Sequence, residues 1–540
     1  MSKAKKLLSV VFAVLFVLPM GLLPAFAAND VTPIVYVYGY RGIYVHNEDG
    51  SYYTPIDEYA PPETTDGDIV SAAISELLPL FAKALVTDNY DEYCDRALEL
   101  LSPIYAEIKP NPDGTVPANT DCGWNWSYDR INANPGPRTI YEYNWDTRLS
   151  PMDVADDLND YINAIMEKTG SSQIVLAARC AGTEVAAAYL WKYQKPVGYA
   201  NIKKYIFTAS TLEGYDYFDL IGSGNVTVPD EALYRYVRQK EILENNIGDE
   251  KLYTFVSAMF DYLESSYGLK LAMGMVDHIY AKIKDRFIAR FLKEFYGISL
   301  GQVGSINEHY EDYKNYVFQE KGDKEKYAAI IAKADDYHYN VQAHFKEMLQ
   351  EMDAADTPVY AIGGYGEQQY PIGDCANYVG DEYVNVGKQT LGATVSKVTE
   401  TLPDDYIAGR EAAGYGKYIS PDRQVDASTC LFPDHTWIVK NLRHDFNNSD
   451  VFDLVTAIAL TENATVTTLE GYPQFLNAKE DHSAMEPMQA VNANDIDWDA
   501  LAPSLSAPAN ALAKIAAFFA RIILWFRSVF SRIGEAFTGK

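Results

Sequence analysis

The sequence predicts an α/β fold in which helices wrap a mainly parallel central sheet, with a large helical insertion and an amphipathic C-terminal helix. Short strand patterns alternate with helix patterns over residues 29–214, which is typical of a parallel sheet. Helical patterns alone then occupy residues 215–355, and strand patterns return between residues 356 and 500. A chain of 540 residues is long enough for one such domain with its insertion, or for two or three separate domains.

The first strand is expected over residues 33–39, which read PIVYVYG. A continuous apolar run that ends in glycine is typical of a buried parallel strand leading into a functional turn. Helices are expected at about 68–86 and 90–104, and a loop rich in Pro, Asn and Gly covers residues 109–138.

The next segments continue the alternation of strand and helix. They are an extended run at 141–146, a helix from 150 to about 168, a strand at 173–177, a helix at 181–193 and a strand at 205–209. Ser150 and Pro151 suit the N-cap and first position of a helix, and Gly170 suits its end. This spacing implies parallel strands joined by helices.

Residues 215–355 read mostly as amphipathic helix, with examples at 253–267, 279–295 and 327–353. A strand pattern returns at 357–364, so the helical block is expected to cover one edge of the sheet as a cap. The expected organisation is a signal peptide (1–28), a core in two parts (29–214 and 356–500), a cap (215–355), and a linker with a helix (501–540).

The N-terminus has the pattern of a secretory signal peptide of bacterial type. Three lysines precede an apolar run over residues 7–23, and Ala25-Phe26-Ala27 provides a cleavage site. A retained membrane anchor is the alternative, but an apolar run of about 17 residues is at the short edge for a span. The mature protein is expected to begin near Ala28 or Asn29, outside the cytoplasmic membrane.

Residues 509–540 form an amphipathic pattern at the other end. At about 100° per residue, Lys514, Arg521 and Arg532 share one face, opposite apolar side chains that include Phe519 and Phe526. Such a helix can lie in a membrane interface. Docking on the protein's own core is the alternative, although the Pro- and Ser-containing linker at 501–508 favours a detachable surface-binding tail.

Composition excludes several classes of protein. With 48% hydrophobic residues and a formal net charge of -30, the chain is neither globally disordered nor suited to nucleic acid, which needs clustered Lys and Arg. The five cysteines show no C-x-x-C pair and no zinc-site spacing with histidine, so no metal or cofactor is expected. Because five is odd, at least one thiol is left outside an intramolecular disulfide. Tyrosine is abundant, with 42 residues, which suits core packing as well as sugar-binding surfaces.

The main chemical motif is the strand-to-helix junction LAARCAG at residues 176–182. A nucleophile elbow places one residue on a strained turn with small residues two before and two after it. Ala178 and Gly182 fill the small positions, and Cys180 fills the nucleophile's position. The adjoining helix N-terminus lowers the pKa of such a thiol, and the Ala181 N–H would donate to an oxyanion. A buried structural cysteine is the alternative.

A nucleophile of this kind needs an acid and then a histidine further along the chain. Residues 420–426, SPDRQVD, offer carboxylates, and a strand expected at 436–442 ends at Arg443-His444. A histidine directly after a final strand is well placed to act as a base, while a surface histidine is the alternative.

These segments resemble the α/β-hydrolase superfamily, in particular lipases and the lecithin:cholesterol acyltransferase-like group. Residues 33–39 resemble the first strand and oxyanion turn of lipases. Four segments are similar to the acyltransferase-like group, namely 143–151 with the helix after it, the elbow at 174–182, the stretch 208–214 with 221–224, and the acid segment 422–425. The resemblance covers most of residues 31–214 and 356–465 and leaves the cap and tail unmatched.

The resemblance implies that Cys180 is the nucleophile, Asp422 the acid and His444 the base, with the backbone N–H groups of Tyr40 and Ala181 as the oxyanion hole. Rival acids and a rival histidine remain, namely Asp374, Asp426, Asp434 and His435. The chain departs from the family where Arg179-Cys180 replaces His-Ser and Ala178 replaces Gly. Cysteine nucleophiles do occur in dienelactone hydrolase-like members of this fold.

The expected function is therefore that of an exported ester hydrolase or acyltransferase that acts on lipid or other acyl esters through an acyl-thioester. It needs no cofactor and associates with membrane or cell envelope through residues 509–540. The alternative is a catalytically inactive protein of the same fold that binds a lipid, glycan or protein partner at the cell surface.

Overall fold

The structure, a computed structural model, describes residues 32–39, 43–46, 52–53, 76–106, 108–123, 126–127, 140–229, 231–232, 235, 277–296, 307–367, 369–444, 449–479 and 484–490. The expected signal peptide, the helix at 253–267, Tyr40, and the linker with the C-terminal helix lie outside these residues. Within the described part of the chain, no helix combines the length and apolar character needed to cross a membrane.

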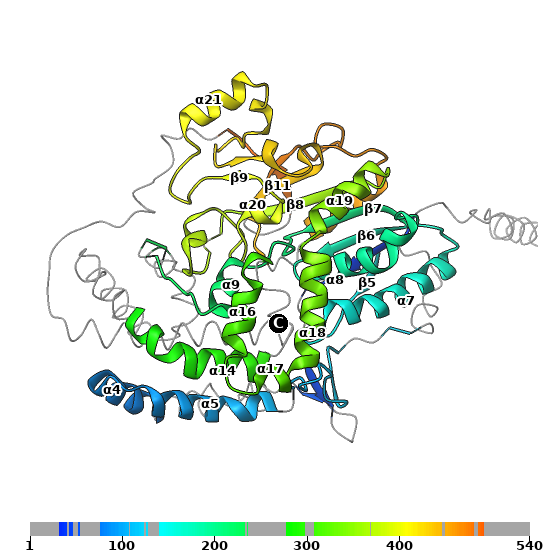
Figure 1. Cartoon of the computed structure of the whole chain (residues 1–540). Coiled ribbons are helices and arrows are strands. Elements are labelled where there is room, and N and C mark those ends of the chain that lie inside the picture. The colour runs from blue at the N-terminus through cyan, green and yellow to red at the C-terminus, as the bar shows by residue number, and fades with distance from the viewer. Residues whose placement is uncertain are drawn as a thin grey trace, which may run out of the picture.

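An eight-stranded sheet forms the centre of the molecule, in the order β13-β12-β11-β8-β7-β6-β1-β5 (Figure 1). Along the chain its strands are β1 (Ile34–Val37), β5 (Ile140–Tyr143), β6 (Ile174–Arg179), β7 (Ile202–Thr208), β8 (Val359–Tyr365), β11 (Thr436–Lys440), β12 (Phe475–Ala478) and β13 (Met485–Pro487). Every neighbouring pair is parallel except β12 and β13. The predicted α/β class with a mainly parallel sheet is confirmed.

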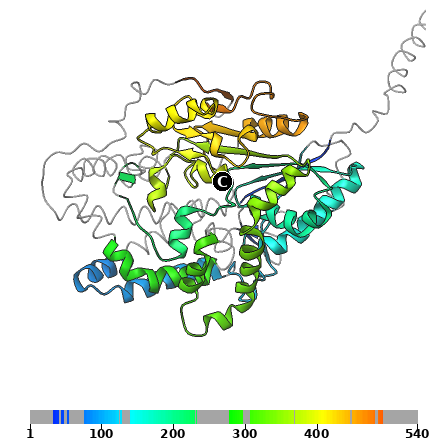
Figure 2. The ribbon, with the colours of Figure 1, turned by 45° about the horizontal axis from the view of Figure 1, so that its top comes forward.

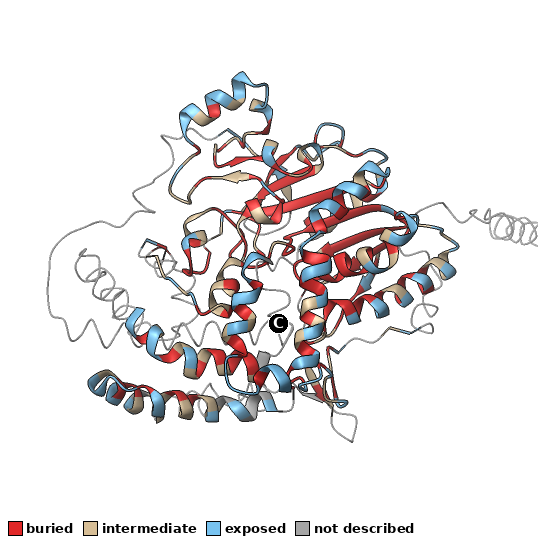
Figure 3. Cartoon of the chain, in the orientation of Figure 1, coloured by how far each residue is buried: buried red, intermediate tan, exposed pale blue. Residues whose placement is uncertain are grey.

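Helices cover both faces of the sheet. On one face α7 (Pro151–Thr169), α8 (Gly182–Tyr189) and α19 (Phe345–Ala354) share a core with residues such as Val35, Leu176 and Phe207. On the other face α22 (Ser449–Leu460) packs on the alternate strand residues, such as Tyr36 and Ile206. The central strands are therefore buried on both sides, which explains their continuous apolar sequences (Figure 3).

The predicted helix at 150–168 has the ends that the sequence indicates. Ser150 is the N-cap of α7, and its side chain accepts a hydrogen bond from the N–H of Met152. Gly170 ends the helix with φ at 68°, in the left-handed region that glycine adopts without strain. The helix predicted at 181–193 is found as α8 continued by the π-helical turn η2 (Leu190–Gln194).

The chain between β7 and β8 is helical wherever the structure describes its regular elements. Its elements are α9 (Asp216–Gly222), η4 (Lys284–Ile288), α14 (Ala289–Phe291), η5 (Leu292–Tyr296), η6 (Asn307–His309), α16 (Tyr310–Val317), α17 (Asp323–Lys326), α18 (Ala328–Asp336), η7 (Tyr337–Gln342) and α19. Residues 327–353, predicted as one helix, are divided among α18, η7 and α19. Of these, α19 packs directly on the sheet through Met348, Leu349 and Met352.

Two helices from the N-terminal part of the chain join this helical region. In α4 (Leu78–Thr87) and α5 (Asp91–Ala106), Phe81 and Cys94 pack with Ile279, Ile283 and Phe287 in one apolar cluster. Figures 1 and 2 both show these helices beside the segment that contains α14. The sequence patterns predicted the helices but not this contact, because an apolar helix face does not specify its partner.

The remaining elements are short. They are β2 (Tyr44–His46), β3 (Tyr52–Tyr53) and β4 (Thr120–Asp121) in one small sheet, β9 (Thr394–Val395) and β10 (Val425–Asp426) in another, the helices α20 (Val386–Gln389) and α21 (Asp404–Ala412), and the 3-10 turns η3 (Lys195–Val197), η8 (Asp374–Asn377), η9 (Gly416–Tyr418), η10 (Ala427–Thr429) and η11 (Pro433–His435).

Candidate active site

Cys180 lies on the turn between β6 and α8 with φ at 51°. A residue other than glycine in this left-handed region is strained, and such strain is typical of a nucleophile elbow. Hydrogen bonds hold the turn, since the Cys180 N–H donates to the Thr208 carbonyl at 3.1 Å and the Thr183 hydroxyl donates to the Cys180 carbonyl at 2.7 Å.

Two glycines let the end of β1 approach this turn. A Cβ added to Gly182 would lie 2.5 Å from the carbonyl oxygens of Val37 and Tyr38, and one added to Gly39 would lie 2.8 Å from the Cβ of Cys180. Both positions therefore require glycine for close packing. This explains the small residue of the elbow motif and the glycine after the first strand.

His444 and Asp381 form a hydrogen-bonded line with Cys180. His444 Nε2 lies 2.9 Å from Cys180 Sγ, and His444 Nδ1 lies 2.7 Å from Asp381 Oδ2. The other oxygen of Asp381 accepts the Val384 N–H at 2.9 Å and the Tyr383 N–H at 3.2 Å. All three side chains of the line are buried, with 7% of Cys180, 5% of His444 and 1% of Asp381 exposed.

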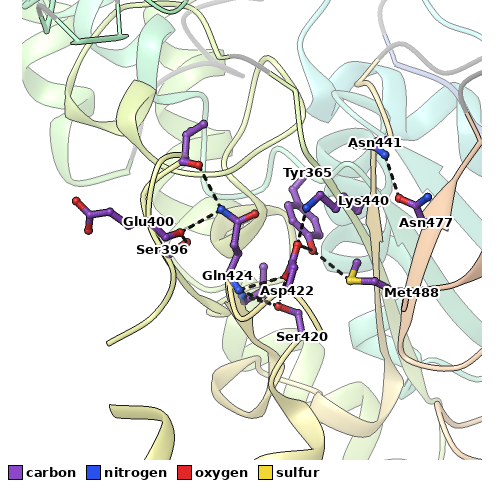
Figure 4. Close-up of polar contacts among 12 residues, drawn as sticks. Tyr365, Ser396, Glu400, Ser420, Asp422, Gln424, Lys440, Asn441, Asn477 and Met488 are labelled. Carbon is purple, nitrogen blue, oxygen red and sulfur yellow. Dashed lines mark hydrogen bonds and ion pairs between the residues drawn. The ribbon is translucent and has the colours of Figure 1, made fainter. Parts of the chain in front are cut away.

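The carboxylate on His444 is that of Asp381 and not that of the expected Asp422. Asp422 Oδ2 lies 2.8 Å from the ammonium group of Lys440 and accepts the Tyr365 hydroxyl at 2.7 Å. Its other oxygen accepts the Ser420 hydroxyl at 2.7 Å. Figure 4 shows these groups converging on Asp422. The Asp422 carboxylate is therefore paired with Lys440, which lies four residues before His444 in the chain.

The rival residues are also engaged elsewhere. Asp426 accepts the Tyr406 hydroxyl at 2.7 Å, and Asp434 accepts the Tyr418 hydroxyl at 2.7 Å. Asp374 accepts the side-chain amide of Asn377 at 3.1 Å. The ring centroid of His435 lies 4.7 Å from that of Tyr360. Asp381 follows β8, the neighbour of the strand that leads to His444. The only sequence signal for Asp381 is therefore its place in the loop after β8, which it shares with Asp374 and Glu382.

The charges of Cys180 and His444 depend on each other. Burial raises the pKa of the Cys180 thiol, but the imidazolium of His444, hydrogen bonds from His444 and Tyr215, and the charge of Arg179 together lower it to about 7. Burial lowers the pKa of His444, but the Asp381 carboxylate and the Cys180 thiolate raise it to about 10. The pair therefore favours a thiolate beside an imidazolium at neutral pH.

Tyr215 is a site residue that the sequence patterns did not identify. Its hydroxyl lies 3.1 Å from Cys180 Sγ, and its ring is buried. The ring of Tyr383 packs against His444, with 4.9 Å between centroids, and Tyr217 lies beside both tyrosines. Among 42 tyrosines, a single one carries no distinguishing signal, and Tyr215 stands where the helical insertion was expected to begin.

Arg179 joins β6 to the loop that carries His444, because its guanidinium donates to the backbone carbonyl of His444. Ala181 is the N-cap of α8, so its N–H lies at a helix end where backbone donors lack helical partners. Tyr40, the second expected oxyanion donor, lies outside the described residues.

No disulfide joins any of the five cysteines, and within the described segments no group of three or more His, Cys, Asp or Glu side chains is arranged to hold a metal ion. No protein-family model matches the chain, and comparison with curated proteins gives no significant match.

Proposed function

We propose that this protein is an α/β-hydrolase-fold enzyme that cleaves or transfers an ester-linked acyl group through a thioester on Cys180. The observation that carries the proposal is the line of Cys180, His444 and Asp381, in which the sulfur lies 2.9 Å from the imidazole and the imidazole 2.7 Å from the carboxylate. Nucleophile, base and orienting acid are the parts of a catalytic triad.

The order of these residues supports the hydrolase fold. Cys180 follows β6, Asp381 follows β8 and His444 follows β11, so the chain order is nucleophile, acid and histidine. In the sheet, β7 separates β6 from β8, and β8 pairs with β11. Parallel strands have their carboxyl ends at one edge, where ligands bind in open α/β sheets. In this fold the helices between β7 and α19 act as the cap that selects the substrate.

The first half-reaction forms the thioester. The thiolate of Cys180 attacks the ester carbon, and the carbonyl electron pair moves to oxygen, where the Ala181 N–H stabilises it. When the carbonyl re-forms, the bond to the alcohol oxygen breaks, and the proton on His444 Nε2 passes to that oxygen. Asp381 keeps the imidazole oriented throughout.

The second half-reaction returns the enzyme to its starting state. His444, now neutral, takes a proton from water or from an acceptor alcohol, and the resulting oxygen nucleophile attacks the thioester. Water yields a carboxylic acid and an alcohol yields a new ester. The choice between hydrolase and acyltransferase therefore depends on which acceptor reaches the thioester.

The location of the enzyme follows from its two ends. We infer export through the signal peptide of residues 1–28, and association with membrane or cell envelope through residues 509–540, because the sequence patterns of both ends favour these roles.

The full mature chain tests the proposal. Incubation with p-nitrophenyl esters of several acyl chain lengths should release p-nitrophenol and leave an acyl group on the peptide that contains Cys180, as measured by mass spectrometry. Cys180→Ala and His444→Ala should abolish both signals, while Cys375→Ala should retain them. Absence of turnover and of acylation for every chain length would contradict the enzyme and favour the inactive binding protein.

A further inference from the structure

We infer that Tyr215 is a further catalytic residue, whose hydroxyl donates the second hydrogen bond to the thiolate of Cys180. The inference rests on the proposed function, since it concerns the same nucleophile. It adds a residue outside the Cys180, His444 and Asp381 line, contributed by the start of the helical insertion.

The position of Tyr215 relative to the sulfur carries the inference. The phenol oxygen lies 3.1 Å from Sγ, a distance comparable with the 2.9 Å between Sγ and His444 Nε2. Sulfur thus has two polar side chains within hydrogen-bond reach while only 7% of Cys180 is exposed. A buried anion needs hydrogen-bond donors to replace lost water, and donors to ionised groups bond about twice as strongly as those to neutral groups.

Contacts of the residues that follow Tyr215 hold it in this position. The adjacent Asp216 forms an ion pair with Lys388 and accepts the Asn385 side-chain amide at 3.2 Å. The Tyr215 carbonyl accepts the N–H of Asp219 at 2.9 Å in the first turn of α9. Lys388 and Asn385 follow Asp381 closely in the chain, so the segment that supplies the acid also anchors the tyrosine.

The hydroxyl keeps its proton through the reaction. When Cys180 attacks, a sulfur lone pair becomes the new carbon–sulfur bond, and the carbonyl pair moves to oxygen. The proton for the leaving alcohol comes from His444. Tyr215 therefore changes the fraction of Cys180 that is thiolate before attack, and it transfers no proton itself.

Few other groups around the sulfur change charge near neutral pH. Burial raises the pKa values of Tyr36 and Tyr217 above that of a free phenol, so both stay neutral below pH 9, and burial raises the pKa of Glu184 well above its usual value, which favours its protonated form. The charged groups that remain nearby are Arg179, Asp381 and Glu382. The acid limb of thiol reactivity thus reports on Cys180, paired with His444.

The experiment measures the rate at which iodoacetamide alkylates Cys180 in the full mature chain from pH 5 to pH 9, with the alkylated peptide identified by mass. Tyr215→Phe removes only the hydroxyl and should move the acid limb upward by about one pH unit, so that alkylation on that limb slows about tenfold. Tyr217→Phe, on the neighbouring ring, is the matched control and should leave the limb in place.

Two results are decisive, and a folding check accompanies them. An acid limb that is identical in Tyr215→Phe and the unmodified protein overturns the inference, even where esters are turned over. A shifted limb without ester turnover supports the role of Tyr215 and contradicts the proposed enzyme. Thermal unfolding checks that Tyr215→Phe is folded. If Tyr215→Phe does not fold, Tyr215→Met is used in its place, because the flexible methionine side chain refills the space.

Discussion

The low pKa of Cys180 comes from its neighbours, because burial alone acts in the opposite direction. Burial raises the pKa of the Cys94, Cys375 and Cys430 thiols to about 12 each. Cys180 is also buried, yet the imidazolium of His444 and the hydrogen bonds to its sulfur lower its pKa to about 7. At neutral pH only Cys180 among these four thiols is substantially ionised, so reagents that need a thiolate should select it.

The pH dependence of acylation should be bell-shaped. Below the apparent pKa of about 7 the thiolate takes up a proton and the nucleophile is lost, so the acid limb falls as pH decreases. Above about 10 the imidazolium loses its proton, and no acid remains for the leaving alcohol. Single-turnover acylation by a p-nitrophenyl ester across this range measures both limbs. A flat profile between pH 5 and 9 would contradict the ion pair.

Replacing each of two buried aspartates tests which of them acts as the proposed catalytic acid. Asp381→Asn should slow acyl transfer by about 10³-fold or more, because an amide favours the wrong imidazole tautomer and does not stabilise the imidazolium. Steady-state kinetics with the best ester substrate provides the measurement.

Asp422→Asn is the matched control. It should keep turnover near that of the unmodified protein but lower the free energy of unfolding by roughly 1–3 kcal/mol, because Lys440 and Tyr365 lose a charged acceptor. Urea denaturation measures the loss. The reverse pattern, with turnover lost only in Asp422→Asn, would identify Asp422 as the acid.

At the scale of elements, the site depends on how closely β1 meets the start of α8. Gly182 is the first residue of α8, and no Cβ fits between it and the carbonyl groups of Val37 and Tyr38. The same approach places Gly39 against Cys180. Packing between these two elements therefore positions Cys180.

Gly182→Ala should lower the free energy of unfolding by about 2 kcal/mol, because its added methyl group meets backbone atoms that cannot rotate away. Chemical denaturation measures the change. Gly409→Ala lies in the exposed part of α21, where the added Cβ meets nothing within 4 Å beyond its chain neighbours and the backbone of its own helix, and should be neutral or stabilising by up to about 1 kcal/mol. Equal stability of the two variants would show that β1 and α8 adjust freely.

At the scale of the molecule, one sheet with two apolar faces carries the site at its carboxyl edge, and a separate helical region lies beside it. The helical region has its own apolar clusters, and in one of them α4 and α5 pack against Ile279, Ile283 and Phe287. A net charge of -30 disfavours binding to anionic partners through general electrostatics, so attachment to a membrane would depend on the basic, apolar residues 509–540.

The full mature chain should float with vesicles that contain anionic lipid, and a chain lacking residues 509–540 should stay in the soluble fraction. Replacing Lys514, Arg521 and Arg532 by Gln is the matched control, which keeps the apolar face and should weaken binding at low salt. Flotation that is unchanged by the deletion would assign membrane binding to another surface. If neither chain floats, residues 509–540 do not serve as a membrane anchor.

The sequence alone predicts the strands β1, β5, β6, β7, β8 and β11, both ends of α7, and Cys180 and His444 as candidate site residues, but not β12, β13 or α22. These features are local, since apolar periodicity, a capping serine, a terminal glycine and a small-residue elbow each act over a few neighbouring residues. The alternation of strand and helix also restricts the sheet to parallel order, which brings the ends of β6 and β11 to one edge.

The tertiary structure alone decided which acid faces His444 and which tyrosine faces Cys180. Several aspartates follow the strands between residues 356 and 500, and Asp422 matched the expected motif. The carboxylate of Asp422, however, binds the ammonium group of Lys440, while the loop after β8 places the carboxylate of Asp381 on the His444 imidazole. Tyr215 reaches the sulfur from the first turn of the insertion. Such contacts depend on loop paths between distant segments, and loop paths are set by packing and hydrogen bonds across the whole molecule.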